Sequence, residues 1–190
     1  MSWFLKMTSK LPSAFLTRTR LCWAAAAAPE TYLTALEQAG AKLTHIFLTH
    51  GHYDHVGAVA ELRRRTGCQV HMDPVDAMGN QMMPLTSDLV DANWPQDGKL
   101  TIDELTFTVY RTPGHTPGSV CLVCGEVMFS GDTLFSGSCG RVDLPGGSMA
   151  QMQKSLSMLA ALPLADDVAV LPGHESFSTL GQERRTNPYL

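Results

Sequence analysis

The chain has 190 residues, of which 44% are hydrophobic and 17% are charged, and its formal net charge is −4. A chain of this size and composition forms one globular domain that buries about 70% of its unfolded surface. It shows no basic footprint for nucleic acid and no apolar run of about 18 residues. We therefore expect neither a nucleic-acid partner nor a membrane partner.

The five cysteines form an odd set without regular spacing. Small secreted domains pair their cysteines in even sets, so this set predicts a reducing compartment and a cytoplasmic protein. Cys121 and Cys124 lie in one apolar strand pattern, facing opposite sides, and are expected to be buried thiols. The sequence carries no signal for an oligomeric state.

Residues 1–28 differ from the rest of the chain: they are basic, contain no acidic residue, and end in alanines at 24–28. Arg18 and Arg20 interrupt the apolar core that a secretory signal needs, whereas the composition fits a transit peptide better. A third explanation is a shifted reading frame, because codons compatible with Leu16–Trp23 encode a turn and a strand start in another frame. The coding DNA tests this explanation. We treat residues 1–28 as an atypical segment, with disorder as one expectation, and residues 29–190 as the domain.

From Pro29 onward, helices and strands alternate. Pro29 begins a helix that ends at Gly40, and Leu43–Thr49 is a strand. A second helix, Val56–Thr66, ends at Gly67, and Cys68–Met72 is a short strand. This helix is expected to turn the following residues inward: Val56, Val59, Ala60 and Leu62. His45 and His71 lie inside the two strands, where we expect structural roles.

The second half of the chain continues this pattern. Leu105–Arg111 alternates as a half-buried strand does, and the strands Val120–Val123 and Val127–Ser130 flank a tight hairpin signal, Gly125-Glu126. Ser148 caps a helix that reaches Leu162, and Val168–Leu171 is the last predicted strand. The helix is expected to bury Met149, Met152, Leu156 and Leu159. The Met-rich stretch 74–94 is interpreted as core filling, with an adaptable substrate wall as the alternative. The alternation predicts a layered α/β protein.

A cluster of metal-binding residue types follows the strand that ends near Thr49: His50, His52, Asp54 and His55. Packing does not require such a cluster, whereas a divalent ion needs imidazole nitrogens and carboxylate oxygens that converge on it. His50 and His52 point the same way while the chain is extended, and Asp54 and His55 come where a helix begins. The spacing therefore predicts two adjacent metal ions.

Three further candidate ligands also follow predicted strands and stand next to a glycine: His115, Asp132 and His174. The alternative is a solvated loop that happens to be rich in histidine. The repeated placement at strand ends favours metal binding.

These motifs resemble the metallo-β-lactamase superfamily. The longer strings 131–135, Gly140-Arg141 and 183–190 resemble its small bacterial glyoxalase II-like hydrolases, from about Pro29 to the C-terminus. The resemblance implies a four-layer αββα sandwich whose first strands are missing or altered here. It also implies the ligand sets, which are His50, His52 and His115 for the first metal, and Asp54, His55 and His174 for the second, with Asp132 as the bridge.

Two divalent ions, with zinc favoured over iron or manganese, would lower the pKa of a shared water and present a metal-bound hydroxide at neutral pH. Asp54 is expected both to bind a metal and to orient this nucleophile. Arg141 matches a basic position that touches the glutathione part of the substrate in glyoxalase II, with a plain surface arginine as the alternative. Ser176 replaces a tyrosine of that pattern, and the helical domain that completes the glutathione site is missing, so glutathione specificity is not implied.

The expected function is hydrolysis of a small-molecule thioester or ester by a dinuclear zinc enzyme. Two alternatives stay open. One is an Fe(II) persulfide (sulfur) dioxygenase of the same fold, and the other is a catalytically impaired member, because of the aberrant N-terminus.

Overall fold

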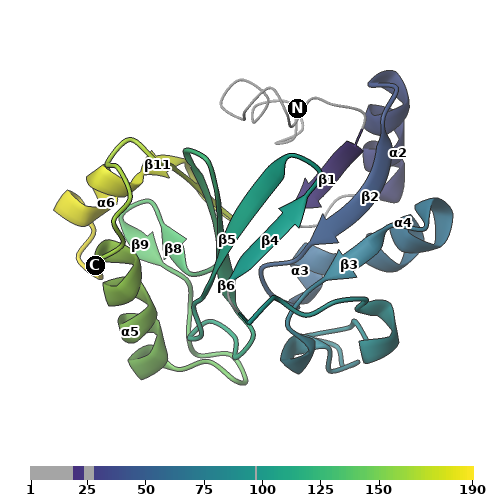
Figure 1. Cartoon of the computed structure of the whole chain (residues 1–190). Helices are drawn as coiled ribbons and strands as arrows, with labels where there is room; N and C mark the ends of the chain where they lie inside the picture. The colour runs from purple at the N-terminus through teal and green to yellow at the C-terminus, as the bar shows by residue number, and fades with distance from the viewer. Residues whose placement is uncertain (1–18, 24–27, 97) are drawn as a thin grey trace.

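The computed structural model describes residues 19–23, 28–96 and 98–190. Two sheets face each other and helices cover their outer sides (Figure 1). The first sheet is parallel, in the order β1 (Thr19–Trp23), β2 (Lys42–Phe47), β3 (Gln69–His71). Helices α2 (Pro29–Gln38) and α4 (Val59–Thr66) lie on its outer side, and the short helix α3 (Tyr53–Val56) follows β2.

The second sheet has the order β11-β10-β7-β6-β5-β4. Its strands are β4 (Lys99–Ile102), β5 (Leu105–Arg111), β6 (Val120–Cys124), β7 (Val127–Gly131), β10 (Ala169–Pro172) and β11 (Ser178–Thr179). Its outer helices are α5 (Met149–Ala160) and α6 (Leu180–Thr186), at the left of Figure 1. The smaller elements are the hairpin β8 (Leu134–Phe135) and β9 (Ser138–Cys139), and the 3-10 turns η2 (Pro74–Asp76) and η3 (Ser87–Leu89).

Three apolar cores produce the four layers. The middle core lies between the sheets and contains Phe47, Phe107 and Leu122. The outer cores join each sheet to its helices, with Ile46 in the first and Cys121 in the second. Successive residues of a strand point to opposite faces, so Ile46 and Phe47 fill different cores, as do Cys121 and Leu122. The predicted αββα sandwich is therefore present.

A strand occupies part of the N-terminal segment in which the sequence showed no strand pattern. β1 pairs in parallel with β2, from Thr19 opposite Lys42 to Trp23 opposite Phe47. Backbone pairing with a neighbouring strand does not require an apolar pattern, which explains why sequence reading missed it. The other residues of the atypical segment, 1–18 and 24–27, lie outside the described residues, and so do the predictions made for them.

Several predicted elements differ in detail. The helix predicted at 56–66 is divided into α3 and α4 around Gly57, so Ala58 is buried and Ala60 is exposed. Met149 is 44% exposed, because it stands in the first turn of α5, and Met78 is also exposed, whereas Met83 fills the core. Strand β4 was not predicted, and Val168–Leu171 is not the last strand, since β11 follows it.

Other predictions are confirmed. The chain reverses at Gly125-Glu126, where Cys124 pairs with Val127 and Gly125 has a φ of 56°, a left-handed conformation that glycine adopts without strain. The thiols of Cys121 and Cys124 are buried on opposite faces. Within the described ranges, no helix has the length and apolar character needed to cross a membrane.

His45 and His71 have the expected structural roles. His45 Nδ1 lies 3.0 Å from His71 Nε2, and the His71 ring stacks on Trp94 and packs edge-on against Phe47. Burial, aided by the adjacent His45, lowers the pKa of His71 to about 4. The neutral ring is therefore part of the core.

We expect His71 to make the protein sensitive to acid. Its folded pKa, about 4, is below the unfolded value of 6.5, so its contribution is complete above pH 6.5 and is lost as the pH falls toward 4. The difference amounts to about 3 kcal/mol. In urea unfolding with a chelator present, His71→Gln should lose less stability between pH 7 and pH 4.5 than the wild type does. Equal losses in the two proteins would contradict this assignment.

Candidate metal centre

The histidine-rich loop begins where β2 has ended, and it turns its imidazoles into the molecule. His50, His52 and His55 are 1%, 2% and 3% exposed. Burying an imidazole that packing does not require costs free energy unless the ring has a polar partner. Helix α3 carries His55 inward and leaves the side chain of Asp54 39% exposed.

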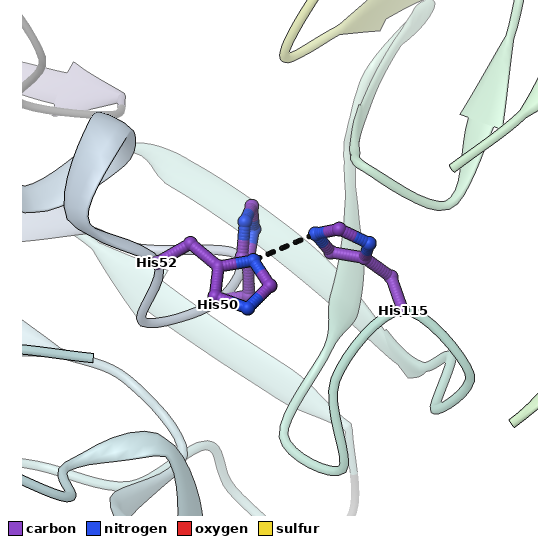
Figure 2. Close-up of side chains that lie close together, drawn as sticks. All are labelled: His50, His52 and His115. Carbon is purple, nitrogen blue, oxygen red and sulfur yellow. Dashed lines mark hydrogen bonds between the residues drawn. The ribbon is translucent and has the colours of Figure 1, made fainter. Parts of the chain in front are cut away.

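The first group consists of His50, His52 and His115, whose ring nitrogens lie within 4.8 Å of one another. Figure 2 shows the three rings converging, with His52 Nδ1 2.8 Å from His115 Nε2. The rings meet nearly at right angles, as separate ligands of one ion do. The prediction that His50 and His52 point the same way is confirmed.

Neighbouring groups orient these rings. The Nδ1–H of His115 donates a hydrogen bond to the carbonyl oxygen of Arg141 at 2.7 Å, which leaves the lone pair of Nε2 facing the group. Thr49 Oγ1 lies 3.2 Å from His50 Nδ1, and the buried His50 Nε2 has no hydrogen-bond partner in the described part of the chain. Helix α5 supports the His115 loop, because Ser155 donates to the carbonyl of Pro113.

The second group consists of Asp54, His55 and His174. His174 Nε2 lies 3.1 Å from both His55 Nε2 and Asp54 Oδ2. The backbone before His174 lies close to Asp132 because Gly173 has no side chain: a Cβ there would lie 2.3 Å from Asp132 Oδ1. His174 is about half exposed, so this group faces the open side of the site.

Asp132 stands between the two groups. Its Oδ1 lies 3.4 Å from His55 Nε2, and its Oδ2 lies 3.5 Å from both His115 Nε2 and His174 Nε2. The carboxylate is 7% exposed, and Oδ1 has no hydrogen-bond partner among the described residues. One side chain thus touches members of both groups.

The electrostatics of His50, His52 and Asp132 favour the protonation states that bind metals, whereas His55 has a raised pKa that favours its protonated form. Burial, together with the neighbouring rings, holds the pKa of His50 well below its usual value and lowers that of His52 to about 4, so both rings are neutral at pH 7. Burial opposes ionisation of Asp132, but its contact with His55 and the nearby imidazoles lower its pKa overall. Burial likewise disfavours the charged form of His55, yet Asp132 raises its pKa. Neutral imidazole and ionised carboxylate are the ligand forms.

The residues therefore fit divalent metal ions. Buried nitrogen and oxygen atoms without partners, His50 Nε2 and Asp132 Oδ1, lie inside the cluster. Imidazole and carboxylate donors suit zinc and iron, and no thiolate belongs to any of the groups.

Comparison with known proteins decides the family. The sequence profile of the Metallo-beta-lactamase superfamily matches residues 19–174. The chain belongs to this superfamily. The match includes β1, so the N-terminal strand is part of the family's domain.

Relatives within the metallo-beta-lactamase superfamily differ in their named activities. The hydroxyacylglutathione hydrolase GloC of Haemophilus influenzae is 34% identical over 85% of this chain and 82% of its own. Three solved structures are also similar. The BLEG-1 B3 metallo-beta-lactamase has a TM-score of 0.80 and 31% identity, and the match covers 90% of this chain and 88% of that one. TTHA1623 in a di-iron-bound form has a TM-score of 0.77 and 35% identity, with 88% of each chain covered, and ETHE1 from Myxococcus xanthus has a TM-score of 0.75 and 29% identity, with 90% of this chain and 74% of that one covered.

In this metallo-beta-lactamase fold, all seven predicted ligands lie together: His50, His52, Asp54, His55, His115, Asp132 and His174. The side chain of Arg141 lies outside this cluster. Its exposed guanidinium forms an ion pair with Asp143 at 2.7 Å, while its carbonyl accepts from His115. The guanidinium therefore has a partner that a substrate would have to displace.

Sequence reading missed the residues that hold the loops of the site. Glu183 and Asn187 belong to the C-terminal string 183–190, but no pattern in the sequence assigned either residue a role. Glu183 accepts a hydrogen bond from the Gly137 amide, and Asn187 Nδ2 donates to the carbonyls of Phe135 and Ser138. They clamp the β8–β9 hairpin between Asp132 and Arg141. Asp76 was the other omission, and no periodicity or spacing signal pointed to it.

Removing the Asn187 amide should loosen this hairpin. Asn187→Ala leaves buried carbonyls unpaired, so we expect a loss of about 2 kcal/mol in the free energy of unfolding. Chemical denaturation measures it, with Gln151→Ala on the exposed side of α5 as control. A loss no larger than in the control would refute the role of the clamp.

Proposed function

We propose that this protein is a dinuclear metal hydrolase, with zinc as its metal, that cleaves a small thioester or ester. The observation that carries the proposal is the position of Asp132, whose carboxylate contacts His115 of the first group and His55 and His174 of the second. A carboxylate in this position would be able to offer one oxygen to each of two adjacent cations. The similarity to a protein named hydroxyacylglutathione hydrolase supports a thioester substrate.

In this proposal His50, His52 and His115 would hold the first ion, Asp54, His55 and His174 would hold the second, and Asp132 would be available to both. Two bound cations supply a polarising charge for the substrate carbonyl and activate water at neutral pH. The buried histidines exclude bulk water from the floor of the site. Asp54, whose side chain is 39% exposed, faces the open side, where it would both hold an ion and orient a water molecule.

Turnover with defined metals tests this function. The protein is loaded with Zn²⁺, Fe²⁺ or Mn²⁺, its bound metal is counted, and S-lactoylglutathione and a simple acyl thioester without glutathione are offered. We expect two ions per chain and hydrolysis of at least one thioester by the zinc form. In His55→Ala, both the metal count and turnover should fall. Loss of metal with unchanged turnover would reject the mechanism.

A second candidate is the Fe(II) persulfide dioxygenase. It is favoured by the similarity to a protein solved in a di-iron-bound form and to ETHE1. Oxygen uptake by the iron-loaded protein with glutathione persulfide distinguishes it from the hydrolase. Nitrocefin hydrolysis is the matching control for a lactamase, because BLEG-1 is also similar. A metal-loaded protein inactive in all these assays would instead be an impaired member.

Arg141 is proposed to contact an acidic group of the substrate. Its ion pair with Asp143 is exposed and screened by solvent, so a substrate carboxylate can exchange with it. Arg141→Met should raise KM for S-lactoylglutathione about tenfold through loss of a charge-assisted hydrogen bond, with kcat nearly unchanged. Asp143→Asn, which frees the guanidinium, should not raise KM. An equal KM in Arg141→Met and the wild type would leave Arg141 as a surface residue.

A further inference from the structure

We propose that Asp76 is a positioning residue that sets the geometry of the first metal group by tying together the two loops that supply it. This inference rests on the proposed function, because it assigns a role toward the ions that His50, His52 and His115 would hold. It concerns a side chain outside the ligand sets.

Asp76 ends the turn η2 and is completely buried. Its Oδ2 accepts hydrogen bonds from the Gly51 amide at 3.2 Å and the Thr116 hydroxyl at 2.7 Å, and its Oδ1 accepts from the Gly118 amide at 3.0 Å. Thr116 is held in turn by Ser119, whose Oγ accepts from the Thr116 amide. Three donors thus satisfy one buried carboxylate.

The donors come from the two loops that carry the first group. Gly51 lies between His50 and His52 in the loop after β2, and Thr116 directly follows His115 in the loop between β5 and β6. These loops belong to different sheets. Among the residues that the structure describes, no donor to Asp76 adjoins His55, Asp132 or His174. The carboxylate therefore links the halves of the molecule at the first group and not at the second.

Two glycines fit closely around Asp76. A Cβ on Gly51 would lie 2.6 Å from the Asp76 carbonyl oxygen and 2.9 Å from its Cβ. A Cβ on Gly118 would lie 2.7 Å from the Asp76 carboxyl carbon. Each loop thus has, at its contact with Asp76, a residue without a side chain. A side chain at either glycine would therefore push its loop away from Asp76.

The charge of Asp76 is held where burial opposes it. Burial raises the pKa of Asp76, against the hydrogen bonds that lower it, so holding the charge in this place costs free energy. An apolar side chain would avoid that cost but would leave the Gly51 and Gly118 amides and the Thr116 hydroxyl without their acceptor. An acceptor with two oxygens joins donors from both loops at one point, and the histidines on those loops must converge to bind one ion.

Metal counting at each site tests the assignment. In equilibrium dialysis against Zn²⁺, Asp76→Ala should bind the first-group ion about 10- to 100-fold more weakly, the usual effect of removing a group that orients ligands. The second-group ion should be nearly unaffected. Adding His55→Ala to Asp76→Ala should remove the remaining ion, whereas adding His50→Ala should leave it bound.

Controls separate this role from general loss of stability. Asp91→Ala removes another carboxylate that accepts a backbone amide, that of Val70, away from the site, so it should lower the melting temperature without changing the metal count. If Asp76→Ala does not fold, the isosteric Asp76→Asn answers the question, because its amide keeps one acceptor oxygen and should weaken the first ion to a smaller extent.

Two results would overturn the proposal. One is wild-type affinity for both ions in Asp76→Ala or in Asp76→Asn. The other is a loss of affinity that is equal for both ions and that follows the loss of melting temperature. A wild-type protein that binds no metal would refute the proposed function instead, so the two failures are distinguishable.

Discussion

Asp132→Asn is expected to lower thioester turnover by about 10²- to 10³-fold, an effect of the size seen when one preorganised electrostatic group of a catalytic site is removed. The change keeps the shape of the side chain and removes the charge that lies 3.4 Å from His55 and 3.5 Å from His115 and His174. Because this carboxylate contacts both ligand groups, both ions should bind more weakly. The metal count should fall below two, with folding largely preserved.

The measurements are metal content after dialysis, kcat with the best thioester found, and the melting temperature in a chelator. Glu61→Gln, which breaks an exposed ion pair with Arg64 on α4, is the matched control and should leave all three unchanged. If the Asp132→Asn protein keeps two ions and more than a tenth of the turnover, Asp132 is no bridge.

Gly140→Ala should disrupt the site by displacing backbone. A Cβ at this position would lie 1.8 Å from the carbonyl oxygen of Asp132, a distance that requires the chain to move. That movement would carry Asp132 away from both groups and shift the Arg141 carbonyl that orients His115. Overpacking against backbone costs about 3 kcal/mol, and turnover should fall about 100-fold, as it does when a catalytic group moves by about 1 Å.

Gly57→Ala is the matched control for this substitution. Gly57 also lies beside the histidine loop, but a Cβ there would approach no closer than 3.8 Å to the Tyr53 carbonyl oxygen. It should therefore fold and turn over substrate like the wild type. Denaturation and thioester assays on both variants give the answer, and near wild-type behaviour of Gly140→Ala would mean that the hairpin tolerates displacement.

The seven side chains predicted as ligands lie together in the fold, because metal binding would restrict both residue type and spacing. Histidines two residues apart on extended chain must share a direction, and His50 and His52 do so. Two predicted helix ends are also confirmed, since Ser148 caps the start of α5 and Gly67 ends α4 in the left-handed conformation. Ala60, Met149 and β1 were not predicted correctly, because a break at Gly57, an exposed first turn and pairing with β2 override local pattern.

By itself, the sequence determined which side chains are able to bind a metal, that they stand at strand ends, and which superfamily their motifs resemble. Only the tertiary structure decided how they meet. It placed Asp132 between His55 and His115, turned the guanidinium of Arg141 toward Asp143, and brought Asp76 between two loops from different sheets. The physical reason is that covalent geometry fixes directions over only a few residues, whereas contacts between residues 25 to 42 positions apart, such as those of Asp76, exist only after the two sheets have packed.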